Sequence, residues 1–357
     1  LQVCEARLKP CPTDADFAEI GFRLRSVWVS RASRESLVMR VMLVMEDTMR
    51  RKTLTAAAAV VLAVLLVAPG SALAQLDDTA AWASHLSNTY RVVPNVTYGT
   101  ANNRENRVDL YLPRGADRPT PVLMYIHGGG WVGGSKESSV LRLLPWLEQG
   151  WAVVNVQYRL GQVSLAPAAV EDCLCALQWI ARNAENYRFD LSRIVTTGNS
   201  AGGHLALTTG MVPASAGLGR ECTSGSFTGP PSLPSVEVAA IINWYGITDV
   251  ADLMRGPNTK GYAVQWLGGL ANRAEVARQT SPLTYVRPGL PPVLTIHGDA
   301  DPIVPYQQGV RLHQALESAG VASELHTVSG GGHGGFDTAE TLAIYATIKQ
   351  FLARHGL

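Results

Sequence analysis

A short motif around one serine has the residue types and spacing of a nucleophilic turn. Gly198-Asn199-Ser200-Ala201-Gly202 fits the pattern G-x-S-x-G. It follows a run that predicts a strand, Ile194 to Thr197, and it opens a helix expected from Ala201 to Met211. A serine at such a turn stands at the positive end of the helix dipole, which stabilises a developing anion. We therefore expect Ser200 to attack an acyl carbon, and the alternative is a structural serine in a glycine-rich turn.

A glycine-rich segment could bind the oxyanion that this attack creates. His127-Gly128-Gly129-Gly130-Trp131 directly follows the apolar run Val122 to Ile126. Consecutive glycines let backbone N–H groups face inward, so we expect Gly129, Gly130 and Ala201 to donate to the oxyanion. The alternative is a dinucleotide- or phosphate-binding loop, but the sequence lacks the pattern G-x-x-x-x-G-K-[ST] and an acidic ribose partner at the usual spacing.

An acid and a histidine follow the serine in the order that a catalytic triad can use. Asp299 and Asp301 come directly after the expected strand Val293 to Ile296. His333 lies five residues after the last expected strand, in a loop of glycines that leaves room for its imidazole. We expect His333 to take the proton of Ser200 and return it to the leaving group, while one of the two carboxylates orients the ring.

The elements that must position these residues alternate between strands and helices. The expected strands are Val92 to Tyr98, Val108 to Leu112, Val122 to Ile126, Ala152 to Gln157, Ile194 to Thr197, Val238 to Trp244, Val293 to Ile296 and Ser323 to Val328. The expected helices are Ser138 to Glu148, Ala166 to Asn183, Ala201 to Met211, Tyr306 to Ala319 and Thr338 to Arg354. Continuous Val, Ile and Leu runs are typical of parallel strands buried on both faces. We predict an α/β protein with one mostly parallel, doubly wound, eight-stranded sheet and an antiparallel hairpin of the first two strands at its edge.

These motifs together resemble the α/β-hydrolase superfamily, most of all bacterial feruloyl-esterase-type and hormone-sensitive-lipase-like esterases. The similar blocks are H-G-G-G-W at 127–131, G-N-S-A-G-G-H at 198–204, W-Y-G-I-T-D at 244–249, H-G-D-A-D-P-I-V-P at 297–305 and G-G-G-H-G-G-F at 330–336. The resemblance runs from about Val92 to the C-terminus. It implies the α/β-hydrolase fold in a single domain without a large cap, and it implies that Asp301, the second Asp of H-G-x-x-D, is the acid.

The resemblance also implies an activity. We expect a secreted serine carboxylester hydrolase that acts through an acyl-enzyme on short-acyl, aryl or hydroxycinnamoyl-type esters, in small molecules, on polysaccharides or in polyesters. An exported peptidase or arylformamidase with the same triad is one alternative, because H-G-G-x-W also occurs in arylformamidases. A non-catalytic hydrolase-like binding protein is the other.

The substrate pocket is harder to place from sequence. Candidate walls are Trp131, Tyr158, Trp244 and Ile303, with core packing as the alternative for an aromatic beside a motif. Two stretches, Thr248 to Gly269 and Pro213 to Pro234, could shape the pocket. The second is rich in Gly, Ser and Pro and is expected to be a surface loop.

The N-terminal part of the chain carries an export pattern. Basic residues at 50–52 precede an apolar run of about 15 residues and a small-residue cleavage pattern that ends at Ala74. The run is shorter than the roughly 20 residues of a permanent membrane span. We expect 49–74 to be a cleaved signal for a secreted or periplasmic protein and 75–357 to be the catalytic domain, with an uncleaved anchor as the alternative. Residues 1–48 are expected to be a disordered extension upstream of the true start at Met49, or else a genuine extension.

The charge balance limits the classes of partner that the protein can bind, and the cysteine spacing limits the disulfides that it can form. The 357 residues carry 30 basic and 29 acidic side chains, which argues against a nucleic-acid partner or stable membrane association after signal cleavage. No zinc-like ligand spacing is present, so we expect no metal and no cofactor, and an ester is the expected partner. Cys173 and Cys175 are two apart on an expected helix and point to different sides, so one of them is expected to pair with Cys222.

Overall fold

The computed structural model describes residues 78, 80–219, 222 and 236–357. The chain divides into two units, Leu1–Ala80 and Ala81–Leu357, and the second contains the fold considered below. The expected extension and export signal lie outside the described residues, as does most of the expected loop Pro213 to Pro234.

None of the helices in the described ranges has both the length and the apolar character needed to cross a membrane.

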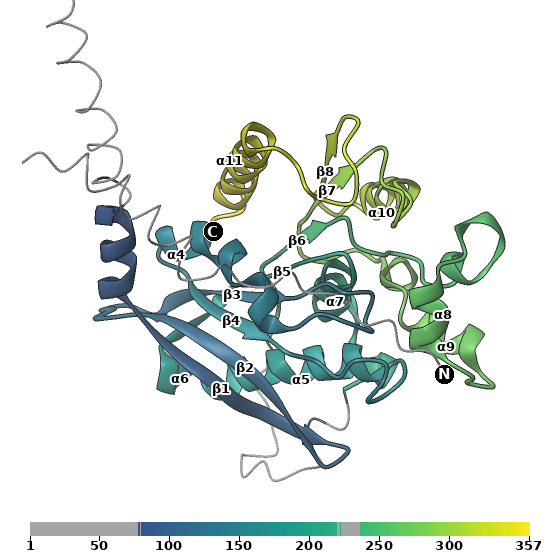
Figure 1. The fold of residues 1–357 in the computed structure, drawn as a ribbon, viewed down its shortest axis with the longest axis horizontal. Helices are drawn as coiled ribbons and strands as arrows, with labels where there is room; N and C mark the ends of the chain where they lie inside the picture. The colour runs from purple at the N-terminus through teal and green to yellow at the C-terminus, as the bar shows by residue number, and fades with distance from the viewer. Residues whose placement is uncertain (1–77, 79, 220–221, 223–235) are drawn as a thin grey trace, which may run out of the picture. The chain divides into compact units, whose positions relative to one another are not determined.

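The second unit is built on an eight-stranded sheet in the order β1-β2-β4-β3-β5-β6-β7-β8 (Figure 1). Its strands are β1 (Tyr90–Ala101), β2 (Arg104–Pro113), β3 (Thr120–Ile126), β4 (Ala152–Val156), β5 (Phe189–Asn199), β6 (Ala240–Trp244), β7 (Val293–Gly298) and β8 (Ser323–Val328). Strands β1 and β2 form an antiparallel hairpin, and β2 also pairs antiparallel with β4. All other neighbours are parallel. The predicted fold class is confirmed, and each expected strand is present, with one or both ends shifted in every strand except β8.

Helices follow the strands along the chain. The longer ones are α5 (Ala168–Arg182), α7 (Ala201–Met211), α10 (Gln307–Ser318) and α11 (Thr338–Arg354). The shorter ones are α4 (Leu144–Glu148), α6 (Ala184–Tyr187), α8 (Gly261–Leu267) and α9 (Arg273–Gln279), with the 3-10 turns η1 (Lys136–Leu143), η2 (Ala214–Ala216), η4 (Asp252–Met254), η5 (Gly256–Asn258) and η6 (Pro282–Tyr285). The helix expected over Ser138 to Glu148 is instead η1 followed by α4. The break coincides with Pro145 in the first turn of α4, where a missing N–H is tolerated.

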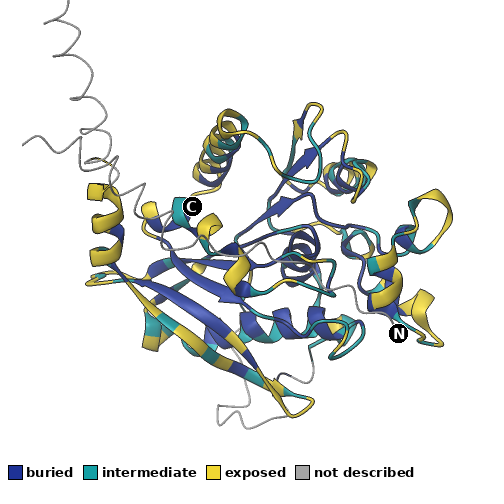
Figure 2. Cartoon of the chain, in the orientation of Figure 1, coloured by how far each residue is buried: buried dark blue, intermediate teal, exposed yellow. Residues whose placement is uncertain are grey.

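Two hydrophobic cores lie on opposite faces of the sheet. One core contains apolar side chains of α5, α7, α8 and α10, and the other contains those of α4 and α11. Strands β4, β6 and β7 are buried along their whole length, as Figure 2 shows by their dark colour. Burial on both faces explains their uninterrupted apolar sequences. Parallel pairing brings the carboxyl ends of these strands to one common edge, where a doubly wound sheet places its ligand site.

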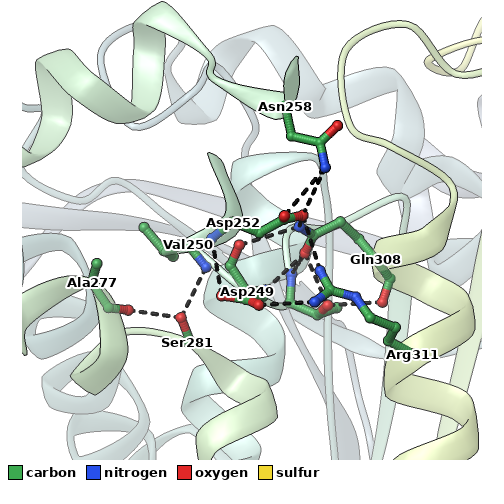
Figure 3. A network of polar contacts seen from close by, with 9 residues as sticks. Asp249, Val250, Asp252, Asn258, Ala277, Ser281, Gln308 and Arg311 are labelled. Atoms are coloured by element: carbon green, nitrogen blue, oxygen red, sulfur yellow. Dashed lines mark hydrogen bonds and ion pairs between the residues drawn. The ribbon is translucent and has the colours of Figure 1, made fainter. Parts of the chain in front are cut away.

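The segment between β6 and β7, residues 248–285, is called the β6–β7 excursion here, and it contains η4, η5, α8, α9 and η6. A polar network anchors its start to α10 (Figure 3). Arg311 makes ion pairs of 3.0 Å with both Asp249 and Asp252, and Gln308 accepts the backbone N–H of Asp249 at 2.7 Å. Near its end, the Ser281 hydroxyl accepts the N–H of Val250 at 2.8 Å. The two ends of the excursion are therefore held together, and its start is held against α10.

The cysteine pairing left open by the sequence is settled by geometry. Cys175 of α5 is bonded to Cys222, and Cys173 is buried and unbonded. The two positions face different sides of α5, so only one can meet Cys222.

Removing this disulfide should lower stability. In the chain-entropy picture, a loop of this length contributes about 4 kcal/mol by restricting the unfolded chain. Cys222→Ala is therefore expected to lower the free energy of unfolding by up to about 4 kcal/mol, measured by urea denaturation. A reductant should destabilise the wild type and leave Cys222→Ala unchanged, and equal sensitivity of both would contradict the pairing.

Candidate active site

Ser200 lies in the tight turn between β5 and α7. Its backbone angles are φ 57° and ψ −122°, a conformation that non-glycine residues rarely adopt. Its N–H donates to the carbonyl oxygen of Trp244 at the end of β6, at 2.9 Å. The residue is only 8% exposed, and it directly precedes the first turn of α7. A side chain held in this position meets a substrate at the positive end of the helix.

Two glycines make this turn possible. A Cβ atom at Gly198 or at Gly202 would clash with the carbonyl oxygen of Ile126, the last residue of β3. The turn therefore passes against the neighbouring strand at a distance that only glycine allows. These are the two glycines of the G-x-S-x-G pattern. The motif therefore requires glycine at both positions because the turn lies directly against the backbone of β3.

The loop after β3 presents unpaired backbone donors. Gly129 has φ 119° and Gly130 has φ 59°, and the Gly129 carbonyl accepts the N–H groups of Val132 and Gly133. Among the described residues, the N–H groups of Gly129, Gly130 and Ala201 donate to no protein acceptor. Free donors on the loop and at the start of α7 are what an oxyanion requires. We call residues 127–134 the oxyanion loop.

The acid and the histidine come together at the ends of β7 and β8. His333 Nδ1 lies 2.7 Å from Asp301 Oδ2. The other carboxylate oxygen of Asp301 accepts the N–H groups of Ile303 and Val304 at 2.8 and 3.0 Å. Asp299 instead accepts the N–H of Gly330 at 2.6 Å. The structure thus places Asp301 against the histidine and gives Asp299 a role in holding the glycine loop.

Asp301 is held as a carboxylate. Burial alone would raise its pKa, but hydrogen bonds from His297, His333 and two backbone N–H groups outweigh burial, and its pKa lies well below the usual range. A charged acceptor at Nδ1 fixes the proton of His333 on that nitrogen and leaves Nε2 to receive a proton from the nucleophile.

The end of β6 connects the serine to the histidine. Trp244 accepts the N–H of Ser200, and the ring of the next residue, Tyr245, packs on His333 with 4.7 Å between ring centroids. In the described part of the chain no hydrogen bond joins the Ser200 hydroxyl to His333. Catalytic hydrogen bonds of this kind often tighten only in the Michaelis complex.

Three of the four expected pocket walls are buried supports. Trp131 is 0% exposed and stacks on Trp266 of α8 with 4.2 Å between centroids. Tyr158 is buried too, and its hydroxyl donates to the carbonyl oxygen of His127 at 3.1 Å. Trp244 packs against α11 in the opposite core. The interpretation of these aromatics as pocket walls is therefore corrected to core packing.

The fourth candidate, Ile303, is 42% exposed beside Asp301.

Tyr262 of α8 is a site residue that no sequence motif indicated. Its side chain lies so close to Gly130 that a Cβ there would come within 2.9 Å of the Tyr262 Cβ and 3.1 Å of its ring, and its hydroxyl donates to the Ile303 carbonyl at 3.2 Å. Burial raises its pKa, and the nearby charge of Asp301 adds to this. Tyr262 thus spans from the oxyanion loop to the loop of the acid. The only sequence signal was its position within the stretch Thr248 to Gly269.

Within the described ranges, no group of three or more His, Cys, Asp or Glu side chains is placed to hold a metal ion.

Comparisons with known proteins identify relatives of this chain. The BD-FAE family model matches residues 108–316. Esterase LipQ of Mycobacterium tuberculosis (strain ATCC 25618 / H37Rv) is 28% identical over 260 residues, which cover 69% of this chain and 58% of LipQ. Esterase LipC of the same strain is 29% identical over 225 residues, covering 61% and 53%. The chain thus spans little more than half the length of these curated relatives.

Solved structures agree with this relationship. A truncated form of a carbohydrate esterase from gut microbiota has a TM-score of 0.60 and 29% identity, covering 74% of this chain and 97% of that one. Butyrate-bound esterase 2 of Thermogutta terrifontis has a TM-score of 0.60 and 25% identity, covering 75% and 95%. The family match covers more than half of the chain, and the sheet order and the resemblance of its motifs agree with it. The chain therefore belongs to the BD-FAE family and has the α/β-hydrolase fold.

Proposed function

We propose that the protein hydrolyses carboxylic esters through an acyl-enzyme formed on Ser200. The observation that carries the proposal is the 2.7 Å hydrogen bond between His333 Nδ1 and Asp301 Oδ2, beside a serine at a strained strand-to-helix turn. The unpaired N–H groups of Gly129, Gly130 and Ala201 support it. A non-catalytic binding protein would have no need for this strained backbone.

The chemistry proceeds in two halves. The Ser200 oxygen attacks the ester carbonyl carbon while His333 Nε2 takes the hydroxyl proton, and the three backbone N–H groups stabilise the oxyanion. The bond to the alcohol oxygen then breaks as His333 gives that oxygen the proton, and the acyl group remains on Ser200. A water activated by His333 attacks the acyl carbon, its proton returns through His333 to Ser200, and the acid is released.

The proposed substrates are short-acyl, aryl or hydroxycinnamoyl-type esters, including esters on polysaccharides and polyesters. Two solved neighbours support the carbohydrate and short-acyl part of this range, because one is a carbohydrate esterase and the other is an esterase with butyrate bound. The names of the relatives favour esters over the peptides or formamides of the alternative reading. Tyr262 and the exposed Ile303 flank the site and limit the room beside it.

We also propose that the protein is exported, to the periplasm or the medium. The signal pattern at 49–74 supports this, and so does the disulfide between Cys175 and Cys222, since such bonds persist in oxidising compartments.

Replacement of the nucleophile should abolish turnover. Ser200→Ala is expected to lower kcat on p-nitrophenyl butyrate by about 10⁴-fold or more, because no other group can form the acyl-enzyme. A fluorophosphonate probe should label the wild type and not the variant. Undiminished hydrolysis by Ser200→Ala would refute the proposed mechanism.

The two aspartates should differ sharply. Asp301→Asn is expected to lower kcat by about 10⁴-fold, because an amide at Oδ2 no longer holds the proton of His333 on Nδ1. Asp299→Asn should lower kcat far less, since its carboxylate contacts only the backbone of the glycine loop. Steady-state kinetics on the same ester distinguish the two variants. A larger loss of kcat in Asp299→Asn than in Asp301→Asn would show that Asp299 is the acid of the triad.

The Tyr262 ring should restrict the acyl group. His333 protonates the alcohol oxygen, so the alcohol part lies toward His333 and the acyl part extends toward the oxyanion loop and Tyr262. Tyr262→Ala is expected to raise kcat/KM for p-nitrophenyl octanoate relative to acetate by about tenfold, which is what burying one or two methylene groups is worth. Tyr262→Phe keeps the ring and serves as the control. An unchanged preference in Tyr262→Ala would show that the acyl group lies elsewhere.

A further inference from the structure

A fully buried histidine outside the triad connects three parts of the site. His204 lies on α7, one turn after Ser200, and is 0% exposed. Its Nδ1 lies 3.0 Å from the indole Nε1 of Trp131, in the oxyanion loop. Its Nε2 lies 2.6 Å from the carbonyl oxygen of Thr280, at the end of α9 in the β6–β7 excursion. One side chain thus contacts the nucleophile helix, the oxyanion loop and the excursion.

The two partners of His204 allow one protonation state. An indole N–H can only donate, so Nδ1 must accept, and a carbonyl oxygen can only accept, so Nε2 must carry the proton. The neutral Nε2–H tautomer alone satisfies both contacts. Burial lowers the pKa of His204 to about 4, which keeps this neutral form at physiological pH.

The Trp131 contact acts on a strained part of the oxyanion loop. Trp131 has φ 62°, a left-handed conformation that is unfavourable for a bulky residue, and it directly follows Gly129 and Gly130. Its carbonyl accepts the N–H of Gly161 at 2.8 Å, and its ring stacks on Trp266 and meets the ring of His204 edge-on. Stacking alone permits sliding, whereas the indole hydrogen bond fixes where the ring lies along α7.

The other side of His204 is rigidly held as well. The Thr280 hydroxyl donates to the carbonyl oxygen of Val276, and the neighbouring Ser281 joins the two ends of the excursion through Val250 (Figure 3). Through its two hydrogen bonds, His204 therefore ties the oxyanion loop to the anchored β6–β7 excursion.

We propose that His204 is a positioning residue of the oxyanion hole, which acts through Trp131 to hold the Gly129 and Gly130 N–H groups at their distance from Ser200. The inference rests on the proposed function, since it concerns the donors used in that reaction. Donors of this kind bind the developing oxyanion more tightly than the ground-state carbonyl. Their misplacement lowers kcat and leaves KM nearly unchanged, which a general loss of packing does not do selectively.

The test compares variants that keep or remove the hydrogen bond. His204→Leu is expected to lower kcat on p-nitrophenyl butyrate about 10- to 100-fold, with KM within about twofold of the wild type. His204→Gln should recover most of this loss, because its amide oxygen can accept from Trp131 and its NH₂ can donate to Thr280. Trp131→Phe, which keeps a six-membered aromatic ring and loses the indole N–H, should match His204→Leu.

The double variant His204→Leu/Trp131→Phe decides whether the two residues act as a unit. Its kcat should be no lower than that of Trp131→Phe alone, because the shared contact is already lost. His313→Leu is the matched control, since His313 lies on α10 and contacts Ser323 and Glu317 away from the site. It should leave kcat unchanged. Thermal unfolding of every variant accompanies the kinetics.

Three results would overturn the inference: additive losses in the double variant, a His204→Gln as slow as His204→Leu, or a rise in KM with unchanged kcat. If His204→Leu does not fold, the kcat values of Trp131→Phe and His204→Gln still test whether the hydrogen bond between His204 and Trp131 supports catalysis. Ser200→Ala separates this inference from the proposed function. If that variant is inactive while Trp131→Phe keeps the wild-type kcat, only the role of His204 fails.

Discussion

The contact between the Ser200 turn and the end of β3 is the constraint on which the site depends. The turn passes so close to the Ile126 carbonyl that Gly198 and Gly202 must lack a Cβ atom. Because β3 continues directly into the oxyanion loop, this contact also sets the distance between the nucleophile and its oxyanion donors. The strained conformation of Ser200 persists because β5 in the sheet and α7 fix the backbone on both sides of the turn.

Support for the catalytic groups comes from both faces of the sheet. On the face of α7 and α8, Trp131, His204 and Trp266 back the oxyanion loop. On the other side of the site, Tyr245 packs on His333, and four hydrogen bonds to Asp301 outweigh the effect of burial and keep its carboxylate charged. The excursion completes the first support, and its ion pairs with α10 explain how a short insertion without a large cap can act as a fixed wall.

The positions of the strands along the chain and the identity of the motifs could be predicted because they depend on local sequence. Continuous apolar runs mark β4, β6 and β7, which are buried on both faces, and the Ser200 turn has a pattern of its own. Helices α8 and α9 could not be predicted, since each spans seven residues, too few for a clear helical period. The burial of Trp131 and Tyr158 depends on partners far along the chain, such as Trp266. The choice between Asp299 and Asp301 needed the resemblance, because both follow β7 and only their turn geometry separates them.

The dispersal of the site over the sheet has a consequence for how the protein reaches its active form. The oxyanion donors follow β3, the nucleophile follows β5, and the acid and histidine follow β7 and β8, the last of which is an edge strand. Parallel pairing of strands so distant along the chain is slow, because long loops must close before any contact stabilises them. Catalytic competence therefore arrives only when the whole sheet has assembled. A chain in which β8 and α11 detached from the sheet would keep its nucleophile and oxyanion loop. It would still be inactive, because His333 would no longer be in place.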